Sequence, residues 1–232
     1  MNEMQQEAYT GVDNLEVMQE AVNYNRYLLN TVCRHAPANA KVLDFGAGSG
    51  QFAAPLSKQG VDVTALEPDA TLRQILMAQG LTAAAATEQL ANESFQYVYS
   101  LNVLEHIDDD VGALRQLYAK VARGGTLLIY VPAFPILYTS MDAKVGHIRR
   151  YKRATLLAAV NGAGFRVESV RYVDSLGFAA ALAFKVFGNA SGHVNRTALR
   201  LYDRCFFPLS RLLDGLTGRW LGKNLLLLAT KA

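Results

Sequence analysis

The sequence predicts an α/β protein in which a doubly wound, mostly parallel sheet carries helices on both faces. The first observation is that short apolar runs with strand character alternate with helix-like segments between residues 41 and 131. The second is that Gly60 and Gly80 each end a helical segment just before a strand. The third is size, because 232 residues with 51% hydrophobic side chains bury a sizeable core. Alternating strands and helices favour a parallel sheet, since each crossover packs back onto it in the right-handed sense.

Five strands and three helices are expected in the first half of the chain. The acidic run at residues 108–110 places negative charge at the start of the third helix, where the helix dipole is positive. The helices are expected over residues 52–59, 71–79 and 111–122. The strands are expected over residues 41–45, 61–66, 81–85, 95–101 and 126–131.

The two ends of the chain depart from this alternation. A helix is expected over residues 15–34, before the first strand. After the fifth strand we expect, in order, a loop over 132–152, a helix over 154–163, a strand over 165–173, a helical stretch over 176–220 and a closing strand over 224–230. The expected units are an N-terminal helical cap (1–36), a core (37–175 and 221–232) and an amphipathic helical insertion (176–220).

The composition excludes several classes of protein. A chain with 19% charged residues and 51% hydrophobic residues is not intrinsically disordered. The two cysteines, Cys33 and Cys205, form no CxxC pattern, which excludes a disulfide-stapled miniprotein and indicates a reducing compartment. A net charge of +3 is too balanced to indicate nucleic acid by itself. A cytoplasmic location is expected, because we find neither a signal peptide nor a run of about 18 apolar residues.

A glycine-rich turn follows the first expected strand. Residues 42–50 read Val-Leu-Asp-Phe-Gly-Ala-Gly-Ser-Gly, which leads from a buried strand through three alternating glycines towards a helix. Glycines let backbone N–H groups approach a ligand closely. The dinucleotide pattern GxGxxG would need glycine or alanine where Gln51 stands, so an NAD site is disfavoured. Glu67, which follows the second strand, is positioned to accept hydrogen bonds from both hydroxyls of an adenosine ribose.

The ordered motifs VLDFGAGSG, ALEPD, FQYVYSLNVLEHIDD and GGTLLIYVP resemble those of class I S-adenosylmethionine-dependent methyltransferases over about residues 41–165. The resemblance implies S-adenosylmethionine as the cofactor. It also implies a Rossmann-like sheet of seven strands whose last strand, fitted by residues 224–230, is antiparallel. The implied cofactor-binding residues are Asp44, Gly46, Ala47, Gly48 and Gly50 at the methionine end, Glu67 at the ribose, Pro68 beside the adenine, Thr87 near its amino group, and Leu101 and Asn102 at the reactive end.

The pair Glu105 and His106 follows the fourth expected strand. A similar stretch resembles a divalent-metal site in quinone-precursor O-methyltransferases, where a further acid stands three residues before the glutamate. Asn102 occupies that position here, so one hard anionic ligand is missing. We therefore expect no metal, and we expect His106 to line the cofactor pocket or to begin a helix.

The loop after the fifth strand is expected to cover the substrate, because ligands of doubly wound sheets bind beyond the C-terminal strand ends. His147 is the expected general base and Asp142 the second candidate. The run GHIRRY at residues 146–151 resembles a methyltransferase subgroup that often acts on small molecules or on sugar- and lipid-linked substrates. A surface lid with solvated charges is the alternative. The expected substrate-binding residues are Tyr138, Arg149, Arg150 and Tyr151.

Basic charge is concentrated before the last expected strand. Residues 196–223 hold six basic residues against Asp203 and Asp214, a net +4, and leucines recur there at helical spacing with an interruption expected at Pro208. Such a stretch could lie on an anionic membrane surface or bind an acidic partner. It could equally pack on the domain or form a homodimer interface.

The sequence therefore predicts methyl transfer from S-adenosylmethionine to a small-molecule acceptor or to a lipid- or sugar-linked acceptor. Two alternatives remain, an NAD-dependent oxidoreductase and a cofactor-binding subunit without catalytic activity. No nucleic-acid partner is expected, because residues 100–103 read Ser-Leu-Asn-Val where DNA amino-methylating enzymes have Asn/Asp-Pro-Pro-Tyr/Phe.

Overall fold

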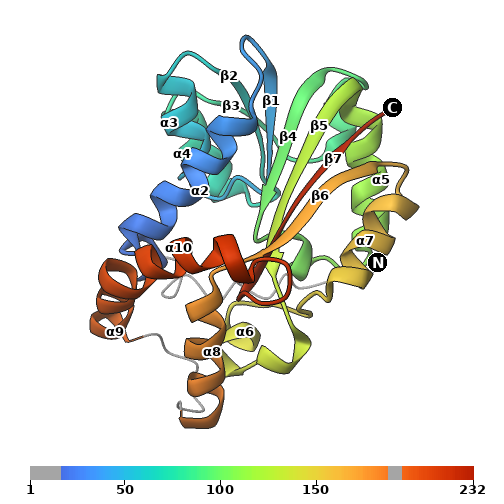
Figure 1. Ribbon diagram of the computed structural model, residues 1–232. Coiled ribbons are helices and arrows are strands. Elements are labelled where there is room, and N and C mark those ends of the chain that lie inside the picture. Colours follow the sequence, from blue (N-terminus) through green and yellow to red (C-terminus); the bar gives the residue numbers. More distant parts are fainter. Residues whose placement is uncertain (1–16, 188–194) are drawn as a thin grey trace, which may run out of the picture.

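The computed structural model describes residues 17–187 and 195–232, and its centre is a seven-stranded mixed sheet (Figure 1). The strand order is β3-β2-β1-β4-β5-β7-β6. The strands are β1 (Lys41–Phe45), β2 (Asp62–Leu66), β3 (Thr82–Ala84), β4 (Phe95–Leu101), β5 (Val121–Pro132), β6 (Arg166–Val173) and β7 (Asn224–Thr230). The first five strands pair in parallel, whereas β7 runs antiparallel to both β5 and β6. The sheet is therefore mixed rather than purely parallel.

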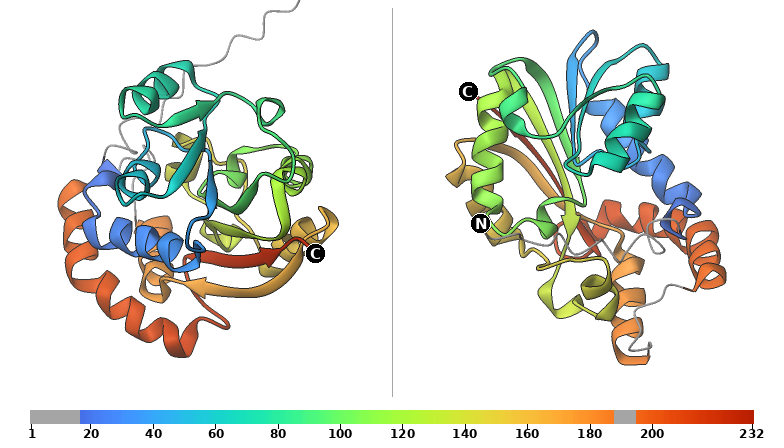
Figure 2. Two further views of the ribbon diagram at one scale, coloured as in Figure 1. Left: turned by 90° about the horizontal axis from the view of Figure 1, so that it is seen from above. Right: turned by 180° about the vertical axis from the view of Figure 1, so that it is seen from behind.

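Helices cover both faces of this sheet (Figure 2), and each face has its own apolar core. One core joins the sheet to α5 (Asp110–Lys120) and α7 (Arg153–Gly162) through side chains such as Leu114 and Leu156. The other joins it to α2 (Val22–His35), α3 (Ala53–Lys58) and α4 (Ala70–Ala78). Burial of apolar side chains on the two faces fixes the order of the layers.

The starts of two elements differ from the expectation by more than three residues. Helix α5 ends at Lys120 and β5 begins at Val121, because Val121 already pairs with Phe95 of β4. The N-terminal helix is interrupted at Ala21, whose ψ of 72° is not helical, and α2 begins at the next residue. The start of the expected cap, residues 1–16, lies outside the described residues.

The expected loop at 132–152 contains two helical turns, η3 (Pro135–Leu137) and α6 (Ser140–Lys144). Helix α8 (Ser175–Phe187) follows β6, and residues 188–194 of the expected insertion lie outside the described residues. These helices and α10 (Phe207–Thr217) gather at one end of the strands (Figure 1). No helix in the described ranges is both long enough and apolar enough to cross a membrane.

Pro208 does not interrupt the helical stretch as expected. Helix α9 (Arg196–Leu201) continues through a π-helical turn, η4 (Tyr202–Phe206), into α10 (Phe207–Thr217). Proline lacks the backbone N–H that an α-helix needs at this point. A wider π turn just before the proline accommodates the missing hydrogen bond without ending the helix.

Candidate functional site

The glycine turn and the turn after β4 meet at the carboxyl edge of the sheet, because β1 and β4 are parallel neighbours. Gly46 has a φ of 80°, and a Cβ atom there would collide with the side chain of Val103. Only glycine allows this contact, which places the turn against η2 (Leu104–His106). The buried Ala47 donates its N–H to the carbonyl of Leu66 at 3.1 Å and fixes the turn to β2.

Glu67 closes the glycine turn from the neighbouring strand. Its Oε2 accepts a hydrogen bond from the N–H of Gly48 at 2.8 Å, and its Oε1 accepts one from the N–H of Asp69 at 3.0 Å. A Cβ atom on Gly48 would meet no heavy atom within 4 Å, so the space above this glycine is open. The turn therefore holds a fixed carboxylate beside open space, which suits a ligand that presents hydroxyl groups.

Asp44 supplies a second carboxyl group at the end of β1. Its side chain is buried, and its Oδ2 has no hydrogen-bond partner among the described residues. Burial raises the pKa of Asp44 to about 7. A buried carboxylate without a partner is costly, and a cationic ligand group would offset that cost. The site therefore fits a ligand that carries positive charge near hydroxyl groups, as S-adenosylmethionine does.

The other expected cofactor residues lie around the same edge. Pro68 is exposed after β2. Leu101 is the last residue of β4, and Asn102 follows it with a φ of 55°. Thr87 is buried at the start of η1 (Thr87–Gln89), and its hydroxyl donates a hydrogen bond to Gln116 of α5 at 3.0 Å. The binding roles of these residues stay predictions.

Asp142 is the centre of a buried hydrogen-bond network in the loop after β5. The guanidinium group of Arg150 binds it with both arms, at 2.8 and 3.0 Å, and the N–H of Thr139 donates at 2.9 Å. Burial alone would raise the pKa of Asp142, but hydrogen bonds from His147 and Arg150 lower it to about 2. A carboxylate held this firmly in its ionised form is suited to orienting a neighbour rather than to accepting a proton.

His147 is oriented by Asp142 and faces Glu105. Its Nδ1 lies 2.8 Å from Oδ1 of Asp142, and because an ionised carboxylate only accepts, Nδ1 carries the proton. Its Nε2 is then free to accept a proton and lies 3.6 Å from Oε1 of Glu105. Glu105 is fully buried, and neither of its carboxyl oxygens has a hydrogen-bond partner among the described residues. Burial raises the pKa of Glu105 to about 8.

His106 completes this cluster. Its ring lies 4.8 Å from the ring of His147, and its Nδ1 lies 3.1 Å from the carbonyl oxygen of Gly146. Burial, reinforced by His147, lowers the pKa of His106 to about 4, so its imidazole is neutral near pH 7.

Glu105, His106 and His147 each offer one ligand atom within 4.8 Å of the others, which is a donor set that could hold a divalent cation. The expectation of no metal rested on Asn102 alone, and the fold brings His147 to this cluster from a distant loop. That expectation stays a prediction. The sequence makes the pair Glu105 and His106 visible and predicts that His106 lines the cofactor pocket or begins a helix, but no residue pattern places His147 beside the pair.

The four expected substrate-binding residues have partners within the protein. The hydroxyl of Tyr138 donates to the carbonyl of His147 at 2.6 Å, and that of Tyr151 donates to Asp110 at 2.6 Å. Arg149 also binds Asp110, at 2.9 Å, while Arg150 is buried against Asp142. These side chains fix the loop over the edge of the sheet, and their contact with a substrate stays a prediction.

An open cavity of about 570 Å³ lies beside this loop, lined by aromatic and basic side chains. The ring of Phe134 stacks on that of Tyr172 at 4.8 Å and forms one wall. Lys152 and Arg153, at the start of α7, also line the cavity. The cavity could receive an apolar group next to an anionic one.

Comparison with known proteins identifies a family. A family model described as a methyltransferase domain matches residues 16–170. A ubiquinone biosynthesis O-methyltransferase of Methylobacterium nodulans is 29% identical over 174 residues, which cover 61% of this chain and 69% of that protein. An uncharacterized methyltransferase of Mycobacterium bovis is 37% identical over 103 residues, 41% of this chain and 52% of that protein. Most of the curated relatives named by this comparison are matched over only about half of their length.

Solved structures share the fold over nearly the whole chain. An S-adenosylmethionine-dependent methyltransferase of Thermotoga maritima, described as a possible histamine N-methyltransferase, superposes with a TM-score of 0.64 at 19% identity and covers 94% of each chain. A methyltransferase of Haloferax volcanii, solved with its activator Trm112, superposes with a TM-score of 0.65 at 16% identity, over 96% of this chain and 94% of that one. At these identities the likeness shows the fold alone.

Proposed function

Because this chain belongs to the class I S-adenosylmethionine-dependent methyltransferases, we propose that it methylates a hydroxyl group of a small or lipid-linked acceptor. The observation that carries this proposal is the network of Asp142, His147 and Glu105 beside the cofactor edge. A hydroxyl acceptor must lose a proton on methylation, and this network contains a free imidazole nitrogen. The name of the Methylobacterium relative, an O-methyltransferase, also favours oxygen as the acceptor atom.

The expected cofactor-binding residues would each contact a different part of S-adenosylmethionine. Glu67 would accept hydrogen bonds from the ribose hydroxyls, and Asp44 would neutralise positive charge at the methionine end. Gly48 leaves room for the ligand over the turn. S-adenosylmethionine supplies an electrophilic methyl group when bound, so the protein needs only to align the acceptor, exclude water and remove a proton.

The loop residues would remove that proton. Asp142 holds His147 in the tautomer whose Nε2 has a free lone pair, and its negative charge stabilises the imidazolium that forms. Oε1 of Glu105 lies 3.6 Å from Nε2, and the raised pKa of Glu105 favours its neutral form near pH 7. An acceptor hydroxyl that enters beside Nε2 would therefore meet a proton acceptor on a rigid support.

The cofactor assignment is tested by calorimetry with S-adenosylhomocysteine. Glu67→Ala should weaken binding about 10- to 100-fold, because a charged hydrogen bond contributes about 1.5–3 kcal/mol. Asp62→Ala is the matched control, since Asp62 is exposed at the opposite end of the same strand. Undiminished affinity in Glu67→Ala, or tight binding of NAD, would contradict the assignment.

The base assignment is tested by radiolabelled methyl transfer into a lipid extract and a panel of phenols. His147→Ala should lower kcat by about 100-fold or more with KM for the cofactor unchanged, because a positioned base contributes about 100- to 10,000-fold. His35→Ala, on the outer helix α2, is the matched control. Activity should survive EDTA. If EDTA abolishes it and Mg²⁺ or Mn²⁺ restores it, His147 is a metal ligand with Glu105 and His106 instead.

A further inference from the structure

Helix α10 buries polar side chains against the protein and exposes leucines to solvent. The face that packs on the protein carries Phe207, Ser210 and Asp214, all buried. The opposite face carries Leu209, Leu212 and Leu216, which are 48, 77 and 75% exposed. A helix on a water-soluble surface normally turns its apolar face inward. This one turns three of its four leucines outward.

The buried polar residues explain why α10 is held this way round. The carboxylate of Asp214 accepts hydrogen bonds from the N–H groups of Asp174 and Ser175, each at 2.9 Å, and Ser210 accepts one from Leu176 at 3.0 Å. These bonds satisfy the free N–H groups at the start of α8. Rotation of α10 to bury its leucines would break all three bonds, so the outward apolar face is fixed by the fold.

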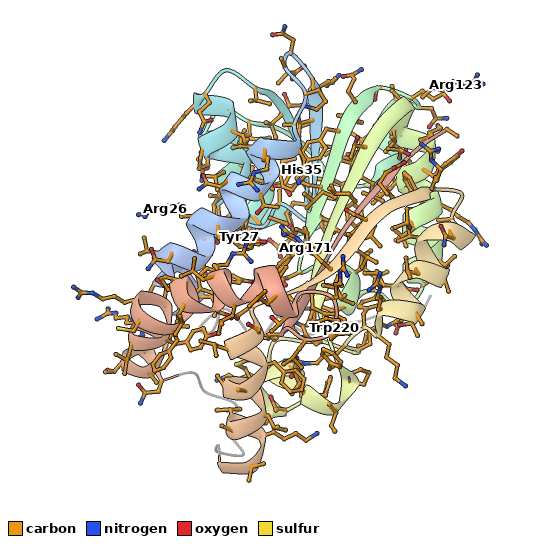
Figure 3. All side chains as sticks on the ribbon, viewed as in Figure 1. Arg26, Tyr27, His35, Arg123, Arg171 and Trp220 are labelled. Carbon is orange, nitrogen blue, oxygen red and sulfur yellow. The ribbon has the colours of Figure 1, made fainter. Side chains whose placement is uncertain are left out.

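Exposed apolar side chains continue along the chain on both sides of α10. Leu201 is 57% exposed in α9, and Trp220 is 70% exposed just after α10 (Figure 3). Eight of the thirteen large apolar side chains that are exposed among the described residues lie between positions 182 and 220. We call Leu201, Phe206, Leu209, Leu212, Leu216 and Trp220 the outer apolar stripe.

Positive charge flanks the outer apolar stripe. Arg196 and Arg200 bind Glu20, and Arg211 binds Asp214 and lies over the ring of Tyr27. Arg204 and Arg219 are exposed and have no acidic partner in the part of the chain that the structure describes. Leucines and a tryptophan bordered by free arginines match the boundary between lipid headgroups and acyl chains.

We propose that the outer apolar stripe binds the surface of an anionic phospholipid bilayer, with α10 lying in the plane of the membrane. No described helix is long and apolar enough to cross the bilayer, which leaves a surface orientation. A symmetric dimer through the same stripe is disfavoured, because it would bring two copies of Arg204 and Arg219, which have no acidic partner among the described residues, into one interface.

The same end of the sheet carries the loop with His147, and Lys185 of α8 binds the carbonyl of Ile136 in that loop at 2.5 Å. Membrane contact would thus hold the substrate loop near lipid-linked acceptors.

Sedimentation with vesicles tests this proposal and requires no methyl acceptor, so it is independent of the proposed reaction. The full chain should pellet with vesicles of phosphatidylcholine and phosphatidylglycerol and remain in solution with phosphatidylcholine alone. Leu212→Glu combined with Leu216→Glu should lower the bound fraction at least about 10-fold, because both side chains lose their apolar insertion. Met77→Glu is the matched control, since Met77 is 54% exposed on α4, away from the stripe.

The charge component has its own variants. Arg204→Gln and Arg219→Gln should each weaken binding to the anionic vesicles about five-fold, whereas Arg123→Gln at the far end of the sheet (Figure 3) should not. Circular dichroism and S-adenosylhomocysteine binding report whether each variant is folded. Equal binding to both vesicle types, or no binding to either, overturns the proposal. So does a dimer in analytical ultracentrifugation that Leu212→Glu with Leu216→Glu converts to a monomer.

Discussion

The carboxyl group of Asp44 is buried where the glycine turn begins, and burial favours its protonated form. Burial raises its pKa from 3.8 to about 7. The folded chain therefore binds this proton more tightly than the unfolded chain does. Since the unfolded state loses the proton first as the pH rises, this group lowers the stability of the folded state progressively between about pH 4 and pH 7.

Asp44→Asn should remove that pH dependence. Without ligand, the variant should be more stable than the natural chain at about pH 8, by on the order of 4 kcal/mol, and equally stable near pH 4. It should also bind S-adenosylmethionine more weakly, because the amide cannot neutralise a cation. Urea unfolding at the two pH values measures the stability, with the exposed Asp62→Asn as control. A variant less stable at pH 8 would show that Asp44 has an unrecognised partner.

At the residue scale, the sequence predicted features that depend on neighbouring residues in the chain. It did not predict which side chains of the loop after β5 are buried. The glycine spacing and Glu67 identified a turn that the structure does build around a fixed carboxylate. The sequence could not indicate that Arg150 turns inward while Arg149 stays near the surface, because neighbouring loop residues have no periodicity. Nor could it place Glu105 beside His147, a contact between residues 42 positions apart.

At the scale of elements, Asp203 of η4 caps helix α2, which is distant from it in the sequence. Helix α2 begins after Ala21, which has no side chain that could cap it, and the carboxylate of Asp203 instead accepts hydrogen bonds from the N–H groups of Asn23 (2.9 Å) and Tyr24 (2.8 Å). These are two of the free donors at a helix N-terminus. The cap joins η4 to the sheet through α2.

Asp203→Ala should destabilise the protein by about 1–2 kcal/mol, the usual cost of losing an N-cap. Hydrogen exchange should speed up at the amides of Asn23 and Tyr24, and Asp203→Asn should restore part of the protection. Asn195→Ala removes the local cap of α9 and is the matched control, because it should leave those two amides unchanged. Unchanged exchange in Asp203→Ala would mean that water replaces the carboxylate without cost.

Element boundaries followed the sequence where apolar runs end at clear breaks. The strands Lys41–Phe45, Phe95–Leu101 and Asn224–Thr230 have the expected bounds. The passage of the helix through Pro208 was not predictable, because it depends on a π turn that no residue pattern indicates. The cap by Asp203 was not predictable either, since it joins segments 180 residues apart.

At the scale of the whole molecule, β7 connects the two apolar cores. It enters the sheet between β5 and β6, and its side chains alternate between the faces. Leu225 and Leu227 belong to the core with α5 and α7, whereas Leu226 belongs to the core with α2 and α3. Strand alternation along the chain gave no sign of this insertion, and only the family resemblance implied an antiparallel last strand.

The leucines of β7 are buried in the cores, whereas those of the outer apolar stripe are exposed. Replacing one leucine of each kind by alanine should therefore change the free energy of unfolding by very different amounts. Leu227 is fully buried between Ile129 and Val170, so Leu227→Ala should cost about 3 kcal/mol and should lower one cooperative unfolding transition for both cores. Leu212 is 77% exposed, so Leu212→Ala should change the free energy of unfolding by less than about 0.5 kcal/mol. Denaturant unfolding measures both. A large loss in Leu212→Ala would mean that this face already packs on the protein in solution, and the apolar stripe would then belong to the fold rather than to a membrane.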